Sequence, residues 1–145
     1  MMHYSYCAQM KPDPDGGFLV VFPDVPEAIT HGENMEEARV NATEALGLAL
    51  RGYLIDGRDI PEPITKPGKG FVDVSVEATD ALKLAVIVAF KAAGLSKCEL
   101  ARRLGKGETE ARRILDPDHP TKLPVLEAAL AVLGKKVLIS ILDTA

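Results

Sequence analysis

The sequence predicts an α+β fold, in which a small antiparallel sheet with one helix is followed by a helical half that ends in a strand. Three observations indicate this fold. Residues 4–22 contain two strand-like segments around a turn-rich stretch, residues 38–53 have helical periodicity, and residues 81–134 read as a series of short helices. A length of 145 residues suits one ordinary domain or two very small ones.

Two strands open the predicted sheet. Apolar and polar residues alternate over residues 4–10, which is the period of a half-buried strand. Residues 12–17, Pro-Asp-Pro-Asp-Gly-Gly, favour a turn, because proline fixes φ and glycine tolerates positive φ. Residues 18–22 then return as the second strand of a hairpin, and residues 29–31 predict a short third strand.

One helix follows the three strands. Asn34 with Glu37 three residues later has the form of a capping box, and small apolar residues recur at helical spacing from residue 38 to residue 53. After a proline-rich connection at residues 60–70, alternation over residues 71–76 predicts another strand. The first half is therefore expected to be β-β-β-α-β.

The second half reads as four helices and a strand. A helix over residues 81–93 is followed by a second capping box that begins a short helix at residues 96–104. Another helical stretch covers residues 109–115, and Pro124 and Gly134 bracket one more helix. Residues 137–142 are almost all apolar and predict a closing strand, which needs an edge to pair with.

Charge divides the chain near residue 77. The whole chain has 17 basic and 21 acidic residues, net −4, which argues against a surface that binds nucleic acid throughout. Residues 1–76 carry 6 basic against 12 acidic residues, whereas residues 77–145 carry 11 against 9. We therefore expect two domains, 1–76 and 77–145, that meet different partners.

The cysteines, histidines and apolar runs predict neither a metal site nor a membrane span. Cys7 and Cys98 have no Cys or His neighbour at a zinc-ligand spacing, and each is expected to be a small buried hydrophobe. The start of the chain lacks the pattern of a signal peptide, and the longest apolar run, residues 84–90, is flanked by lysines. These features predict a cytoplasmic protein without cofactor or metal.

Residues 95–115 predict a helix-turn-helix, because two short helices meet at a glycine-containing turn with Ala101 at the crossing. A small helical bundle with solvated charges is the alternative. Glu108 and Glu110, at the start of the second helix, would face phosphates or base edges, so we expect low affinity per monomer and binding as a dimer. The candidate DNA contacts are Lys97, Thr109, Arg112, Arg113 and Lys122.

The acidic first half suits a basic protein partner, because complementary charge speeds encounter. The alternative is an ordinary solvated acidic rim. Candidate contacts are Asp24, Glu27, Glu33, Glu36 and Glu37. Two-metal phosphodiester cleavage needs converging carboxylates, and the first strand carries none, so no enzymatic activity is expected. Asp24 lies between prolines and is interpreted as a turn residue rather than a metal ligand.

Several motifs together resemble the HicB antitoxins of HicA–HicB toxin–antitoxin modules. They are Gly16-Gly17-Phe18, the run from Phe22 to Gly32, Met35-Glu36-Glu37-Ala38 and the segment from Leu95 to Leu115. The resemblance implies a degraded ribonuclease-H-like first domain that covers the HicA mRNA interferase, and a second domain that binds the operator DNA of its own operon. Lys106-Gly107 replaces the family's usual aliphatic residue and serine at the turn.

A homodimer or tetramer is expected, because the apolar strand at residues 137–142 would otherwise expose an aggregation-prone edge. Two other functions stay open. A stand-alone helix-turn-helix regulator could sense a small molecule with its first half, and a residual nuclease would require metal-dependent cleavage. The first of these predicts a ligand-responsive operator with no toxin gene beside it.

Overall fold

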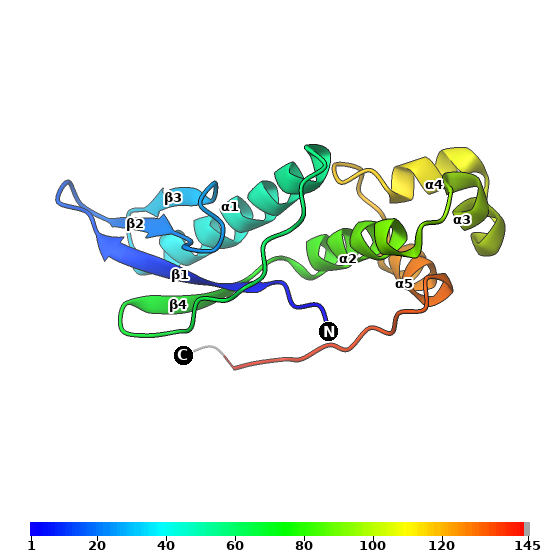
Figure 1. The fold of residues 1–145 in the computed structure, drawn as a ribbon. Helices are drawn as coiled ribbons and strands as arrows, with labels where there is room; N and C mark the ends of the chain where they lie inside the picture. The colour runs from blue at the N-terminus through cyan, green and yellow to red at the C-terminus, as the bar shows by residue number, and fades with distance from the viewer. Residues whose placement is uncertain (144–145) are drawn as a thin grey trace. The chain divides into compact units, whose positions relative to one another are not determined.

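The computed structural model describes residues 1–143 and divides the chain into two compact units, Met1–Leu84 and Ala85–Ala145 (Figure 1). We call them the first unit and the second unit. The elements in chain order are β1 (Ser5–Pro12), β2 (Phe18–Val21), β3 (Ile29–Gly32), α1 (Met35–Ile55), β4 (Phe71–Ser75), α2 (Ala78–Ala93), α3 (Lys97–Leu104), α4 (Glu108–Ile114) and α5 (Leu123–Val132).

The predicted antiparallel sheet is confirmed. Its strand order is β3-β2-β1-β4, and each neighbouring pair is antiparallel. The turn between β1 and β2 closes by a hydrogen bond from the Asp13 amide to the Gly17 carbonyl, at 2.9 Å. Gly17 has a φ of 74°. Residues with a side chain rarely adopt this conformation, so the Gly-Gly pair makes the hairpin possible.

Helix α1 covers one face of the sheet, as the ribbon in Figure 1 shows. Its N-terminus is capped as expected, because the Asn34 side chain accepts a hydrogen bond from the Glu37 amide at 2.9 Å. Ala38, Ala42, Leu46 and Leu50 are fully buried, which places this side of α1 in the core. A Cβ on Gly32 would overlap the backbone nitrogen of Ala38, so only glycine lets β3 approach the helix this closely.

The second unit packs α3 against α4 and α5 around a small apolar core. Leu100, Ala101 and Ala111 are buried at its centre. Gly105 ends α3 with a φ of 66°. The Lys106 amide donates to the Ala101 carbonyl at 2.9 Å, and residues 105–107 connect α3 directly to α4. The sequence places α4 at residues 109–115, whereas the structure shifts it by one residue to Glu108–Ile114.

Two sequence-based expectations are wrong. Residues 137–142 form no strand, and Leu138, Ile139, Ile141 and Leu142 are between 72% and 88% exposed. Apolar character alone does not create a strand, because a strand also requires a hydrogen-bonding neighbour. Cys98 is exposed rather than buried, because it lies in the first turn of α3 on the side away from Leu100. Cys7 is buried, as expected.

Candidate partner-binding and nucleic-acid-binding surfaces

The five acidic residues expected to contact a partner fall into two groups. Asp24 and Glu27 already have partners within the first unit. Glu33, Glu36 and Glu37 are exposed around the start of α1, and they form no ion pair with any residue in the range 1–143. Their carboxylates also suit the positive end of the helix dipole. The start of α1 is therefore the part of this acidic set that is open to a partner.

Asp24 holds a distant loop in place. One of its carboxylate oxygens accepts from the Thr65 amide at 2.8 Å, and the other accepts from the Thr65 hydroxyl at 2.7 Å. The Tyr6 hydroxyl also donates to the Pro61 carbonyl at 2.6 Å, so two contacts fix the proline-rich connection against the sheet. Burial is the main cause that raises the pKa of Tyr6 to about 12. No local signal near Asp24 indicates Thr65, which lies 41 residues later.

Glu27 belongs to a cluster at the far end of α1. The Arg58 guanidinium lies 4.1 Å from the centre of the Tyr53 ring, which is a cation–π contact. The same guanidinium lies 3.7 Å from the Glu27 carboxylate. Burial raises the pKa of Tyr53, and a hydrogen bond with Glu27 raises it further. These contacts stabilise the end of α1, and nothing in the sequence between Glu27 and Arg58 marks them as partners.

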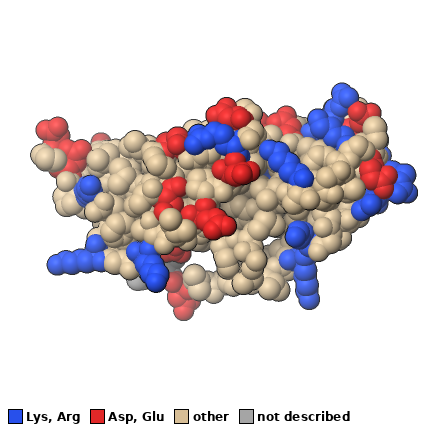
Figure 2. Space-filling model, in the orientation of Figure 1, with Lys and Arg blue, Asp and Glu red and all other residues tan. Residues whose placement is uncertain are grey.

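In the second unit, the side chains expected to contact DNA are exposed. Lys97 begins α3, Thr109, Arg112 and Arg113 lie on α4, and Lys122 precedes α5. Figure 2 shows lysines and arginines gathered over the end of the second unit where α3 and α4 lie, with acidic side chains between them. The mixture is important, because it lowers the positive field that this end can present.

Each arginine of α4 is paired with a glutamate of the same helix. The Arg112 guanidinium lies 2.8 Å from the Glu108 carboxylate, and the Arg113 guanidinium lies 2.9 Å from that of Glu110. All four side chains are about half exposed or more, so solvent screens both pairs and each one is weak. Arg112 and Arg113 can therefore exchange these carboxylates for phosphates or base edges at little cost.

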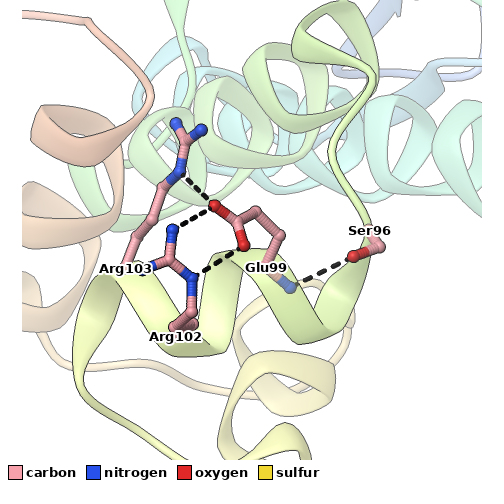
Figure 3. Close-up of polar contacts among 4 residues, drawn as sticks. All are labelled: Ser96, Glu99, Arg102 and Arg103. Carbon is pink, nitrogen blue, oxygen red and sulfur yellow. Dashed lines mark hydrogen bonds and ion pairs between the residues drawn. The ribbon is translucent and has the colours of Figure 1, made fainter.

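Glu99 has a role that sequence reasoning missed. The Ser96 hydroxyl accepts from the Glu99 amide at 3.1 Å, which is half of the expected capping box. The Glu99 carboxylate does not return to Ser96, and instead accepts from Arg102 at 2.6 and 2.9 Å and from Arg103 at 3.0 Å (Figure 3). Hydrogen bonds from Arg102 and then Arg103 lower the pKa of Glu99 to about 2. The i, i+3 and i, i+4 spacing is the signal that indicates this contact.

The turn before α4 caps the helix weakly. Gly107 occupies the N-cap position with φ −78° and ψ 165°, and no side chain accepts from the first turn of the helix. Serine or aspartate would supply such an acceptor. Glu108 and Glu110 compensate in part, because their charges lie at the positive end of the helix dipole.

Residues 1–143 contain no cluster of three or more histidine, cysteine, aspartate or glutamate side chains that could hold a metal ion. Within the same residues, every helix is too short or too polar to cross a lipid bilayer.

The fold and the surface charge define the class of protein. It is an α+β protein of two compact units, the first with a negative and the second with a positive net charge. Residues 5–85 match the model of the family described as HicB-like antitoxin of bacterial toxin–antitoxin systems. The chain therefore belongs to the HicB-like antitoxin family.

Curated relatives resemble the chain over most of its length. It is 36% identical to Antitoxin HicB 1 of Photorhabdus laumondii, over 94% of this chain and 86% of that protein. It is 42% identical to Antitoxin HicB 2 of the same organism, over 82% and 84%. It is 35% identical to Antitoxin HicB of Escherichia coli K12, over 91% and 95%.

Proposed function

We propose that this antitoxin binds and occludes a HicA-like mRNA interferase toxin through residues 1–76, and represses its own operon by binding operator DNA through residues 77–145. It acts by binding alone, in the cytoplasm. The observation that carries the proposal is the separation of charge: the first unit has 7 basic against 14 acidic residues, and the second has 10 against 7.

The acidic first unit suits a ribonuclease partner. A protein that cleaves RNA must bind phosphates, so it carries a basic surface that an acidic antitoxin complements. Glu33, Glu36 and Glu37 offer exposed carboxylates for this contact, whereas Asp24 and Glu27 shape the neighbouring surface through their internal partners. The hairpin β1–β2, strand β3, α1 and the return to β4 beside β1 support a partial ribonuclease-H-like classification. Strand β1 carries no carboxylate, which favours inhibition over catalysis.

The pair α3–α4 supports the proposed helix-turn-helix. Two short helices joined through Gly105 place α4 as the recognition helix, with Thr109, Arg112 and Arg113 exposed and Lys97 and Lys122 as backbone contacts. A single copy offers one short helix, so operator binding requires two copies that read two half-sites. The exposed apolar segment 137–142 is the surface through which a homodimer or tetramer forms.

Two experiments test the two halves of the proposal. Co-expression with a HicA-like toxin from the neighbouring reading frame should restore growth, and persistent growth arrest would contradict neutralisation. For DNA, gel shifts on the upstream region at rising salt should show a steep loss of affinity.

Arg112→Ala should weaken operator binding by about 1–3 kcal/mol. The matched control is Lys91→Ala on α2, an exposed basic residue outside α3 and α4. A flat salt response, or equal effects of the two variants, would contradict DNA binding by α4.

A further inference from the structure

Helix α1 has a largely exposed face on the side away from the sheet. Val40, Leu48 and Ile55 are 56%, 65% and 57% exposed, and Glu37 and Glu44 are exposed beside them. At about 100° per residue, these five positions fall within roughly 80° of the helix circumference. They lie opposite the buried Ala38, Ala42, Leu46 and Leu50. We call these five residues the outer face of α1.

The composition of the outer face is unusual for a helix that covers one side of a sheet. Such a helix normally buries one apolar stripe and presents polar residues to water. Here the sheet lies against one side of α1 (Figure 1), and the opposite side still carries three large aliphatic side chains along the helix. Aligned exposed aliphatic residues, unlike single scattered ones, are typical of a binding surface.

Around the outer face, the charged side chains that lack an ionic partner are all acidic. Glu37 and Glu44 lie on it, and Glu33 and Glu36 lie at its N-terminal end; no ion pair to these four is found within residues 1–143. Arg51 falls at a similar angle around the helix, but its guanidinium lies 4.0 Å from the Asp80 carboxylate, which offsets its charge. The surface is therefore an aliphatic stripe bordered by carboxylates that have no basic partner.

We propose that the outer face of α1 is the docking site for the toxin, through a basic protein surface with an apolar centre. This inference rests on the proposed function, and it assigns the proposed toxin contact of the first unit to one face of α1. The aliphatic side chains supply area that is buried on binding, and the carboxylates supply charge complementarity to a protein that binds RNA phosphates. Because α1 is packed and capped in the free chain, docking needs no folding of this surface.

The test compares exposed aliphatic residues from two places in the first unit. Leu48→Arg and Val40→Arg place a positive charge on the outer face. Ile64→Arg places the same charge on a residue that is 76% exposed in the connection before β4. Affinity for a purified HicA-like toxin is measured by calorimetry, with growth rescue as a second readout, and thermal melting confirms that each variant is folded.

The expected result is a loss of affinity of about tenfold or more for Leu48→Arg and Val40→Arg, with Ile64→Arg close to wild type. If the wild type binds toxin and both outer-face variants bind equally well, the docking site is overturned while the proposed function stands. Equal weakening by all three variants would also overturn the docking site, because the loss of affinity would then come from adding positive charge anywhere on the first unit. If the wild type does not bind toxin, the proposed function and the docking site both fail.

Discussion

The start of α1 in the first unit and helices α3 and α4 in the second differ in whether their charged side chains are paired. In α3 and α4, Arg102, Arg103, Arg112 and Arg113 each lie within 3.0 Å of a glutamate carboxylate of the same helix. The glutamates at the start of α1, by contrast, have no basic partner in the part of the chain that the structure describes. A partner at the start of α1 would therefore meet these carboxylates directly, whereas a partner at α3 or α4 must first exchange internal ion pairs.

The largest expected effect tests whether the two units are independent. Gly32→Ala adds a Cβ that would overlap the backbone of Ala38. It should destabilise the first unit by about 3 kcal/mol, because a packed backbone cannot move aside freely. Toxin neutralisation should then be lost at a temperature at which operator binding persists. Thermal melting and gel shifts on the same sample measure both.

Gly52→Ala is the matched control for that substitution. Gly52 lies within α1, and a Cβ added there meets nothing within 4 Å. The change should stabilise the protein by about 0.5 kcal/mol, because alanine loses less backbone entropy than glycine in a helix. Simultaneous loss of operator binding and neutralisation in Gly32→Ala would show that the units unfold together.

A second, smaller effect concerns the ion pairs of α4. Glu108→Gln removes the carboxylate that lies beside Arg112. It should strengthen DNA binding by a few fold, about 1 kcal/mol at low salt. The removed carboxylate no longer repels DNA phosphates, and the Arg112 guanidinium no longer pairs with it. Gel shifts at two salt concentrations measure it. Glu127→Gln on α5 is the control for net charge alone. Equal gains in the two variants would show that the pairing itself has no effect.

The third prediction is a pH dependence from Glu99. Its pKa is about 2 in the folded protein, below the ordinary value of 4.5. Its ion pairs therefore stabilise the fold fully above the ordinary value, and that contribution disappears as the pH falls towards the pKa in the folded state. Glu99→Gln should melt below the wild type at neutral pH, and the two should melt together once the carboxylate is protonated. A difference in melting temperature that does not change on acidification would contradict these pairs.

The smallest expected effect concerns the cap of α4. Gly107→Ser should add an acceptor for the first turn and stabilise the second unit by about 0.3 kcal/mol. The position has open space and negative φ, so serine fits without strain.

Gly105 has positive φ, so Gly105→Ala should instead destabilise the second unit, by about 1 kcal/mol. Chemical denaturation compares the two, and a loss of stability in Gly107→Ser would show that the hydroxyl does not cap.

Most of the fold could be predicted from residues that lie close together in the sequence. The Asn34 and Ser96 caps and the Gly-Gly hairpin depend on residues within a few positions of each other, so the sequence alone reveals them. The family resemblance, confirmed by the relatives, added the functional class. The DNA and toxin contact residues stay predictions.

What the sequence could not reveal depends on distant residues. Asp24 and Thr65 are 41 positions apart, and Glu27 reaches Arg58 only because the first unit folds. The segment 137–142 was expected to be a strand on its apolar pattern, but strand formation depends on a neighbour that a pattern within one segment does not specify.

That same segment is where we expect proteolysis to begin. Proteases bind substrates as extended chain, and residues 137–142 are already accessible and free of ladder hydrogen bonds in the single chain. Limited digestion of dilute protein should therefore begin at this end, while the capped helices resist. Any assembly that pairs the segment would remove the cleavage site, so turnover would fall as concentration rises.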